Sequence, residues 1–390
     1  MKRIGIYGGT FNPPHIGHRK AAEAAVELLR LDKLLLMPAA QSPDKLQPSV
    51  PAQHRLEMLR LMAGERMEVS DLEIRRGGIS YTVETLKTLA QQYPDAELYL
   101  CVGSDMFCSF LSWKEPETIL KLAKLAVFCR GDRDEAQRIC QQKAVLEQMG
   151  AQVVLVDNPV TEIASSNLRR LIAFQCGDPF LDEPVLRYIQ THGLYGWGQD
   201  WKNLSMEALE QVVVSLLKAN RVRHVLGCRD TAAELARIWG VDETDAARAG
   251  LLHDITKALD GPLQLTICKQ YDIILSGFSQ RNPKTLHALT GSLVAERIFG
   301  ENKAVVDAIC SHTTGKGNMN TLEKIIYVAD YMEPNRDFPG VEQLRSLAYT
   351  NLDKALKLGL EMTLAMLKSQ GRDISPESQE ALQYLEDRGV

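Results

Sequence analysis

The stretch RIGIYGGTFNPPHIGHRKAAEAAVELLR, residues 3–30, decides the fold of the first half of the chain. It opens with a short apolar run that ends in two glycines, and it continues into an amphipathic run with helical spacing. A buried strand followed at once by a helix begins a right-handed βαβ unit. Gly8 and Gly9 let the backbone turn sharply, and their amides can face the phosphate oxygens of a ligand.

The same alternation of strand and helix continues to about residue 195. The predicted strands lie at 3–9, 33–39, 97–103, 124–130 and 151–157, the predicted helices at 17–30, 51–63 and 82–93, and an extended segment at 67–74. This pattern predicts an α/β, Rossmann-like domain with a parallel sheet, in which ligands bind beyond the carboxyl ends of the strands. Both the 8–18 stretch and VGSDMF (102–107) fall at such ends.

From about residue 205 the pattern becomes helical, with no convincing strand. The predicted helical stretches are 205–220, 230–240, 243–259, 302–312 and 321–332. A chain of 390 residues also exceeds the size at which one hydrophobic core keeps growing. We therefore expect an α/β domain at 1–196, a linker at 197–204 and an all-α domain at 205–390.

The composition restricts the partners of the protein. A formal net charge of −5 gives no general attraction to nucleic acid or to an anionic membrane, so phosphate binding must come from local sites. The apolar part of MKRIGIYGG is too short for a signal peptide, and no run reaches the length of a transmembrane helix. The eight cysteines are scattered without a C-x-x-C pair, which is typical of free, buried thiols. These observations predict a cytoplasmic protein.

Two histidines mark the first candidate site. Pro13 and Pro14 hold the loop extended, and His15 and His18 follow three residues apart where the helix begins. Their rings therefore share one face near the positive end of the helix dipole. With the glycines before them, this arrangement favours polyphosphate binding over a solvated loop with incidental histidines.

The first 195 residues resemble the nicotinate mononucleotide adenylyltransferase family, within the nucleotidyltransferases marked by H-x-G-H. The segments that carry the resemblance are PAAQSPDK (38–45), HRLEML (54–59), SYTVETL (80–86), VGSDMF (102–107), SWKEPETIL (112–120), IASSNLRRLI (163–172) and VLRYIQTHGLY (185–195). The resemblance implies transfer of adenylate from ATP, with Mg²⁺ held by substrate oxygens, to nicotinate mononucleotide. The products are deamido-NAD and pyrophosphate. An adenylyltransferase for pantetheine phosphate or for nicotinamide mononucleotide remains the alternative.

The same resemblance assigns the site residues. His15 and His18 would be catalytic and contact the ATP phosphates. The implied substrate-binding residues are Gly8, Gly9, Thr10, Phe11, Lys45, Thr85, Gly103, Asp105, Trp113, Arg130, Ser165, Ser166 and Arg169. From the residues alone, Ser165 and Ser166 can cap a helix whose free amides bind phosphate, and Trp113 can equally be a core aromatic. Asp44 and Ala164 stand where the family commonly has histidine and serine.

The helical half holds a second set of candidate residues. Four of the eight histidines lie there, His253 is followed by Asp254, and Asp330 lies inside the apolar stretch KIIYVADYM. An unpaired buried aspartate would be costly, and a metal removes that cost. Imidazole and carboxylate without thiolate suit Fe, Mn, Co or Zn. More than four potential ligands suggest two metals, with Asp254 bridging them.

Residues 205–370 resemble the YqeK-type subgroup of HD-domain phosphohydrolases. The matching segments are RVRHVLG, AGLLHDITK, ICSHTTG, MNTLEKIIYVADYMEPNRDFPG and ALKLGLEMTLAML. The resemblance implies symmetrical hydrolysis of diadenosine tetraphosphate to two ADP at a di-iron centre. Its implied metal ligands are His224, His253, Asp254, His287, His312 and Asp330, with Lys257 and Arg336 as phosphate contacts; Asp254 and Lys257 would be catalytic.

Alternatives stay open for this half. The metal site could act on another nucleotide, such as a guanosine polyphosphate, or the half could be a non-catalytic sensor or dimerisation module that regulates the first. The predicted partners are the small nucleotides ATP, nicotinate mononucleotide and diadenosine tetraphosphate, with no nucleic acid and no membrane. A homo-oligomer is possible.

Overall fold

The computed structural model describes residues 1–43, 50–129, 133–157 and 163–390. The chain divides into two compact units, Met1–Gly198 and Gln199–Val390. Within the second unit, Trp201 is buried and stacks on Phe299, so part of the predicted linker packs onto the helical unit. The limits at 196 and 205 themselves stay a proposal.

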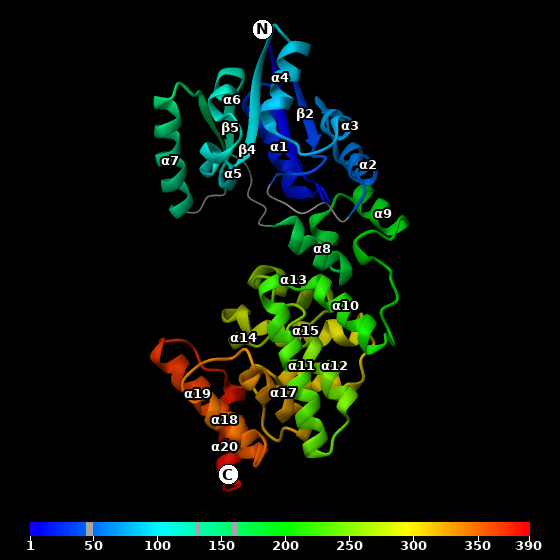
Figure 1. Cartoon of the computed structure of the whole chain (residues 1–390), viewed down its shortest axis with the longest axis vertical. Coiled ribbons are helices and arrows are strands. Elements are labelled where there is room, and N and C mark those ends of the chain that lie inside the picture. Colours follow the sequence, from blue (N-terminus) through cyan, green and yellow to red (C-terminus); the bar gives the residue numbers. More distant parts are fainter. Residues whose placement is uncertain (44–49, 130–132, 158–162) are drawn as a thin grey trace. The chain divides into compact units, whose positions relative to one another are not determined.

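The first unit is built on a six-stranded parallel sheet with the order β3-β2-β1-β4-β5-β6 (Figure 1). The strands are β1 (Lys2–Gly9), β2 (Lys33–Pro38), β3 (Met67–Val69), β4 (Ala96–Gly103), β5 (Lys124–Phe128) and β6 (Val153–Val156). The order reverses between β1 and β4, and ligands in such sheets bind beyond the carboxyl ends at the reversal. Tyr7 pairs with Cys101, so Gly9 and Gly103 end the two strands at this point.

Helices cover both faces of the sheet because side chains alternate along each strand. Ile4 and Ile6 of β1 belong to the apolar cluster that includes α4 to α7. Leu34 and Leu36 of β2 belong to the cluster that includes α1, α2, α8 and α9. The helices are α1 (Ile16–Leu28), α2 (Ala52–Met62), α3 (Leu72–Arg76), α4 (Thr82–Gln92), α5 (Ser104–Cys108), α6 (Pro116–Leu122), α7 (Arg133–Gln148), α8 (Ser165–Ala173) and α9 (Glu183–Thr191).

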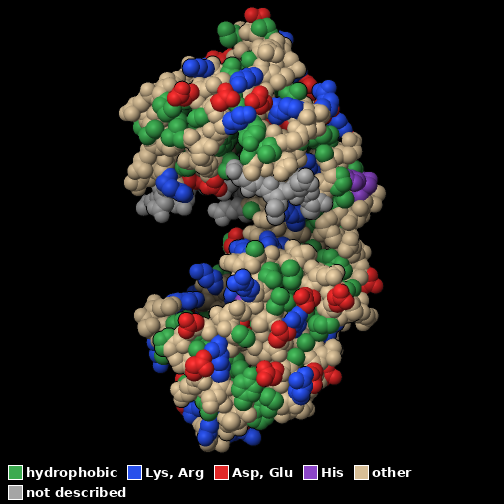
Figure 2. Space-filling view, in the orientation of Figure 1, with side chains coloured by type: hydrophobic (Ala, Val, Ile, Leu, Met, Phe, Trp, Pro, Cys, Tyr) green, Lys and Arg blue, Asp and Glu red, His purple; other side chains and the backbone are tan. Residues whose placement is uncertain are grey.

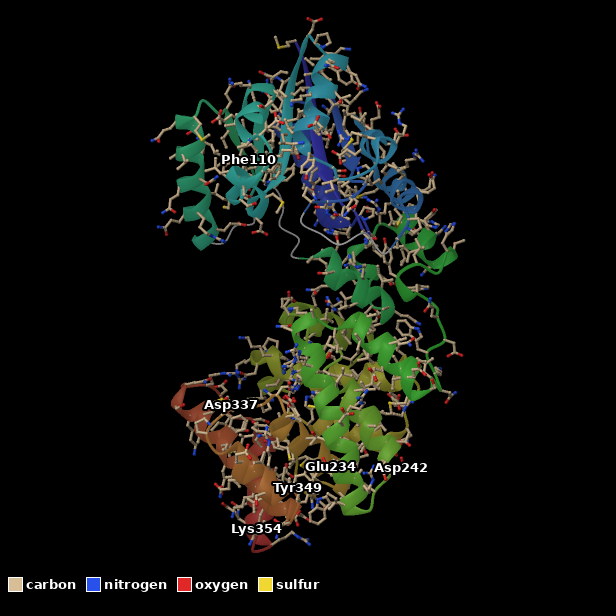
Figure 3. All side chains as sticks on the ribbon, viewed as in Figure 1. Phe110, Glu234, Asp242, Asp337, Tyr349 and Lys354 are labelled. Carbon is tan, nitrogen blue, oxygen red and sulfur yellow. The ribbon has the colours of Figure 1, made fainter. Side chains whose placement is uncertain are left out.

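The described residues of the second unit form helices joined by turns and loops, with no strand among them. The helices are α10 (Met206–Leu216), α11 (Ala219–Trp239), α12 (Glu243–Leu252), α13 (Gly261–Gln270), α14 (Gly277–Arg281), α15 (Leu286–Arg297), α16 (Lys303–Ser311), α17 (Thr321–Met332), α18 (Val341–Ala348), α19 (Leu352–Ser369) and α20 (Pro376–Asp387). Helix α11 packs against α12 and α17. At the end of α18, the Tyr349 hydroxyl donates to Glu234 of α11 over 3.0 Å, and Figure 3 labels both residues.

The predicted fold classes are confirmed, and four predicted elements are wrong in detail. The 205–220 helix is interrupted because Leu217 takes an extended conformation and buries its side chain. The 243–259 helix ends at Leu252. The chain then turns through 253–259, where the backbone hydrogen bonds join residues three apart, not four apart as in an α-helix. The 67–74 segment forms a strand only to Val69 and continues into α3. The helix predicted over 230–240 is the second half of α11, which begins at Ala219. Burial of particular side chains overrides the local pattern in the first two cases.

The surface and the thiols agree with an ordinary globular protein. Basic and acidic side chains alternate over the visible face of each unit, in keeping with the small net charge (Figure 2). All eight cysteines are free, but Cys140 and Cys310 are exposed, so the prediction of buried thiols is wrong for these two. Among the helices of the described residues, none has the length and apolar character needed to cross a lipid bilayer.

Candidate functional site

The loop between β1 and α1 is held from three sides. Arg55 of α2, only 1% exposed, donates through Nη1 to Thr10 O (2.9 Å) and Ala39 O (2.8 Å). Arg169 of α8 donates to Asn12 O over 2.7 Å. The Tyr195 hydroxyl donates to Asn12 Oδ1 over 2.7 Å, and burial raises the pKa of this phenol, so it stays a donor. The loop is therefore fixed before any ligand arrives, as electrostatic catalysis requires.

His15 and His18 lie together at the start of α1, as predicted. His15 is the residue before the helix, and the two ring centroids are 3.7 Å apart. The His15 backbone N–H donates to His18 Nδ1 over 3.3 Å. In neutral His18 the proton is consequently on Nε2, the atom that can donate to a phosphate oxygen. Gly8 and Gly9 immediately precede this loop at the carboxyl end of β1.

Other predicted residues surround the same sheet edge. Gly103 ends β4, and Asp105 follows, exposed, in the first turn of α5. Thr10 is half-buried, and Phe11 is buried with its ring 5.0 Å from that of His18. These positions place the H-x-G-H loop and the GSD segment on the two adjacent strands at the reversal of the sheet.

The predicted serine cap is wrong. The residue before α8 is Ala164, and no side chain caps the helix. Ser165 is already helical and donates to Pro13 O over 3.4 Å, while Ser166 follows as the second helical residue. The helix begins one residue earlier than the serines suggested, and Ser165 joins Arg169 in holding the loop.

Two of the predicted substrate-binding residues, Thr85 and Trp113, have structural partners. Thr85 is 2% exposed, donates to Glu73 over 2.6 Å and accepts from Arg76 over 3.1 Å. Trp113 is half-buried, with its ring centroid 5.2 Å from that of Phe110, which Figure 3 labels. The Trp113 ring can therefore pack in the core with its buried part and still contact a substrate with its exposed part. Lys45 and Arg130 lie outside the described residues.

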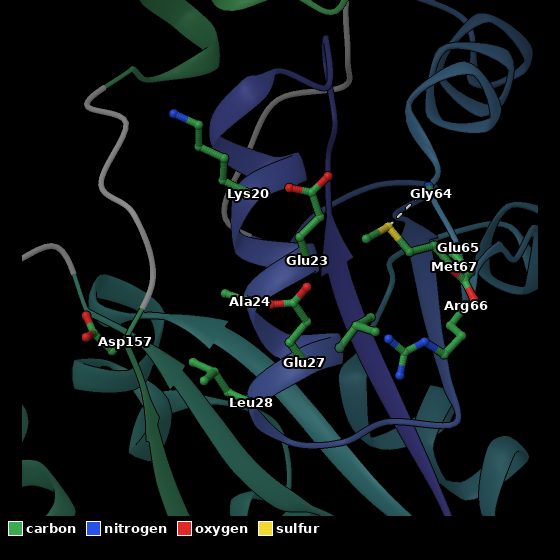
Figure 4. A pocket seen from close by; sticks show the side chains of 11 residues that line it. Lys20, Glu23, Ala24, Glu27, Leu28, Gly64, Glu65, Arg66, Met67 and Asp157 are labelled. Atoms are coloured by element: carbon green, nitrogen blue, oxygen red, sulfur yellow. Dashed lines mark hydrogen bonds between the residues drawn. The ribbon is translucent and has the colours of Figure 1, made fainter.

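A separate cavity of about 460 Å³ in the first unit contains none of the predicted site residues. It is lined by α1 together with residues 64–67 and Asp157 (Figure 4). The lining contains four carboxylates, Glu23, Glu27, Glu65 and Asp157, and only two cationic side chains. This charge does not suit a polyphosphate.

We expect Arg55→Met to loosen the loop. The change leaves the Thr10 and Ala39 carbonyls without their buried donor, at a cost of about 1–3 kcal/mol. Hydrogen exchange of peptides spanning residues 8–18 should become faster. The exposed Arg60, on the same helix and paired with Glu57, provides the control Arg60→Met, for which exchange should not change. Equal exchange in both variants would contradict the anchoring role of Arg55.

The second unit brings all six predicted ligands together. His224 lies within α11, His253 directly follows α12, and His287 is the second residue of α15. His312 directly follows α16, and Asp330 lies in α17. The four histidines are at most 7% exposed, and they converge from separate helices.

Asp254 divides these ligands into two groups. Its Oδ2 atom is 3.7 Å from His224 Nε2 and 3.5 Å from His253 Nε2, and Asp330 Oδ1 is 3.1 Å from His224 Nε2. Its Oδ1 atom is 3.5 Å from His287 Nε2 and 3.8 Å from His312 Nε2. We call the group of His224, His253 and Asp330 the first position, and the group of His287 and His312 the second position. A carboxylate with one oxygen toward each group is placed to bridge them.

Every imidazole of the centre has its Nδ1 atom tied to an acceptor. Nδ1 of His253 is 2.8 Å from Gly250 O, that of His287 is 2.9 Å from Lys284 O, and that of His312 is 2.7 Å from Ile309 O. Nδ1 of His224 is 3.1 Å from the buried Glu333 carboxylate. These acceptors hold the proton on Nδ1, so the Nε2 lone pairs face carboxylate oxygens. A divalent cation removes that unfavourable pairing, and the residues present therefore fit a metal centre.

Burial supports the same conclusion. It lowers the pKa of His253 and His287 well below their usual value, and that of His312 to about 4. These imidazoles are thus neutral near pH 7, which is the form that binds a metal.

Cationic side chains line one side of the centre. Arg336 Nη2 donates to Asp330 Oδ1 over 2.6 Å, Arg221 forms an ion pair with Asp254, and Lys257 Nζ is 2.7 Å from His287 Nε2. A cavity of about 430 Å³ opens beside them, lined by Asn220, Arg221, Arg223, His224, Glu333, Asn335 and Arg336. Guanidinium groups next to a metal centre suit a phosphorylated substrate.

Several residues of the two sites were missed in the sequence. Arg55 and Tyr195 lie in quoted family segments, but nothing local marks them as anchors of the loop. In the second unit Arg221, Glu333 and Cys228 were missed; Cys228 Sγ is 3.7 Å from His224 Nε2. The i, i+4 spacing of His224 and Cys228 on one helix could have signalled the proximity of that thiol. Burial raises its pKa well above the usual value.

Comparison with known proteins agrees with both halves. Residues 6–171 match the Cytidylyltransferase-like family model, and residues 221–335 match the HD domain model. A probable nicotinate-nucleotide adenylyltransferase of Symbiobacterium thermophilum is 36% identical over 205 residues, covering 51% of this chain and 98% of that protein. The chain belongs to the nicotinate-nucleotide adenylyltransferase family. Both predicted resemblances are confirmed. The first half of the chain matches adenylyltransferases, and residues 221–335 match an HD domain, which fits a hydrolase role.

One relative matches both units of this family member. The probable nicotinate-nucleotide adenylyltransferase/Ap4A hydrolase of Mycoplasma pneumoniae is 29% identical over 373 residues, covering 93% of this chain and 98% of that protein. A solved structure of a predicted HD superfamily hydrolase involved in NAD metabolism, from Clostridium acetobutylicum, is 38% identical. It covers 47% of this chain and 98% of that one, with a TM-score of 0.46.

Proposed function

We propose that the chain is a bifunctional enzyme of adenine nucleotide metabolism. The first unit would transfer adenylate from ATP to nicotinate mononucleotide. The second would hydrolyse diadenosine tetraphosphate symmetrically to two ADP at a centre of two divalent metals. The observation that carries the second assignment is the division of the ligands by Asp254, with one carboxylate oxygen toward each group.

In the first unit, the proposal assigns positioning and charge stabilisation to the loop. A phosphate oxygen of nicotinate mononucleotide forms a bond to the α-phosphorus of ATP, and the bond to pyrophosphate breaks. His18 Nε2 donates to a phosphate oxygen, and His15, next to it, adds a second imidazole. Such transfers need little covalent help from the protein and much preorganisation. The anchored loop supports this role, as does the reversal of the sheet.

In the second unit, the proposed metals would be held by His224, His253 and Asp330 at the first position and by His287 and His312 at the second, with Asp254 shared. Divalent metals bound there would supply an activated water and neutralise phosphate charge. Iron is the metal we propose, with Mn, Co or Zn as the alternatives. The chain itself contributes three cations that can hold phosphate oxygens. Arg221 and Arg336 line the cavity beside the centre, and Lys257 contacts His287 within the centre.

A nucleotide panel tests the substrate of the second unit. We expect the full chain loaded with Mn²⁺ or Fe²⁺ to convert diadenosine tetraphosphate into ADP as the sole nucleotide product. The reason is that symmetrical cleavage places two phosphates on each product. Chromatography of products from dinucleoside polyphosphates, guanosine polyphosphates and mononucleotides makes the measurement. Strong turnover of another substrate and none of diadenosine tetraphosphate would refute this assignment.

A further inference from the structure

One histidine of the metal centre has a different partner behind it from the other three. Three of the four imidazoles place Nδ1 against a backbone carbonyl oxygen. Nδ1 of His224 instead lies 3.1 Å from Oε1 of Glu333, which is 1% exposed. A buried carboxylate is costly unless it accepts hydrogen bonds, so its donors indicate its role.

N–H groups donate to both oxygens of the Glu333 carboxylate. Oε1 faces His224, and Oε2 accepts from the backbone N–H of Asn335 over 2.8 Å and from Asn335 Nδ2 over 2.7 Å. The same Nδ2 atom donates to Arg223 O over 3.2 Å, which fixes the orientation of the amide. A backbone N–H can only donate, so the atom at the place of Oε2 must be an acceptor.

The surrounding chain keeps the Glu333 carboxylate in this place. Arg345 of α18 donates to Glu333 O over 3.0 Å and to Arg336 O over 2.9 Å, and it thereby fixes the turn after α17. Gly227 lies one turn after His224 on α11, and a Cβ atom there would clash with Glu333 Oε2. Glycine inside a helix costs about 1 kcal/mol relative to alanine, and here it leaves the space that the carboxylate occupies.

We propose that Glu333 is a positioning residue of the metal centre, which holds the proton of His224 on Nδ1 and leaves Nε2 free to bind a divalent cation. This inference rests on the proposed metal centre. With the proton on Nε2 instead, the ring would present a donor to the cation and could not bind it. A carboxylate behind a ligating histidine also orients the ring and raises its basicity. Glu333 acts on the cation through His224.

Glu333→Gln tests the assignment of the proton. Because the backbone N–H of Asn335 requires an acceptor, the glutamine should place its oxygen there and turn its NH₂ group toward His224. Nδ1 of neutral His224 then accepts, and the proton moves to Nε2. We expect nitrogen-15 NMR of the metal-free full chain, labelled at histidine, to show this change of tautomer. His224→Gln identifies the signal by removing it.

Metal affinity provides the second readout. Glu333→Gln should raise the Kd of the Mn²⁺ ion bound by His224 by about 10–100-fold, the usual effect of losing such a partner. Electron paramagnetic resonance of free Mn²⁺ measures this, and His224→Gln identifies the ion by weakening its binding as well. Gly227→Ala crowds Oε2 and should weaken the same ion.

Glu301→Gln is the matched control. Glu301 is also a buried carboxylate of the second unit, and it accepts from Arg248 Nε over 2.8 Å. This variant should retain both the tautomer of His224 and the affinity for Mn²⁺. Circular dichroism of each variant checks that the helices remain folded.

The two readouts separate the positioning role from the metal centre itself. An Nδ1 proton on His224 in Glu333→Gln, or an affinity for Mn²⁺ equal to that of the wild type, would overturn the role of Glu333 while leaving the metal centre. Equal losses in Glu301→Gln would overturn it too, because they would be a general effect of replacing a buried carboxylate. Failure of the wild type to bind Mn²⁺ would overturn the positioning role and the proposed hydrolytic centre together.

Discussion

Replacing His253 with alanine is expected to remove metal from the first position and to stop nucleotide hydrolysis. His253 is fully buried, its Nε2 atom is 3.3 Å from His224 Nε2, and its Nδ1 atom is fixed by Gly250 O. Alanine deletes one of the nitrogens that face Asp254. Because a bound metal lowers the pKa of water from about 15.7 to about 7, its loss should reduce hydrolysis by more than about 10³-fold.

The measurement combines metal content with the rate of ADP formation. Cys268→Ala is the matched control, because Cys268 is a buried thiol of α13 outside the metal centre. It should retain metal and hydrolysis. Unchanged hydrolysis by His253→Ala would leave the HD assignment without support. Adenylyl transfer by the same variant should remain at the wild-type rate, since the residues proposed for that reaction lie in the other unit.

Replacing His18 with alanine is expected to lower adenylyl transfer by about 10²–10³-fold, the usual effect of deleting one preorganised donor to a developing charge. The loop remains anchored through Thr10 and Asn12 in this variant, so the loss should be in kcat more than in binding of the mononucleotide. His18→Asn keeps a side-chain donor near the same place and should recover part of the activity.

Initial rates of pyrophosphate release measure this effect. His192, an exposed histidine that follows α9, provides the control His192→Ala, which should transfer adenylate normally. A kcat for His18→Ala within about threefold of the wild type would contradict the role of the imidazole, because loss of such a donor costs at least about 10²-fold.

Local pattern was sufficient for much of the fold. The strand and helix around Gly8 and Gly9 follow from apolar spacing, and the change of class near residue 205 follows from the loss of predicted strands. The order of strands was not accessible, because the pairing of β1 with β4 depends on packing across many residues. The helix predicted over 243–259 fails where the chain must turn His253 and Asp254 inward.

The sites show the same division between local and non-local information. His15 and His18 are neighbours on one helix end, so their proximity follows from spacing. Six metal-type residues in the helical half were selected by chemistry, but their meeting point depends on contacts such as that of His224 with Glu333, which are 109 residues apart. The serine cap at 165–166 failed because the helix begins after Ala164.

The central claim is that the chain holds two separate polyphosphate-handling sites, one in each unit. The most direct test is to assay wild type, His18→Ala and His253→Ala side by side for both reactions under one set of conditions. We predict that His18→Ala loses only adenylyl transfer and that His253→Ala loses only hydrolysis of diadenosine tetraphosphate. Loss of both reactions in either folded variant, or retention of hydrolysis in His253→Ala, would contradict the claim.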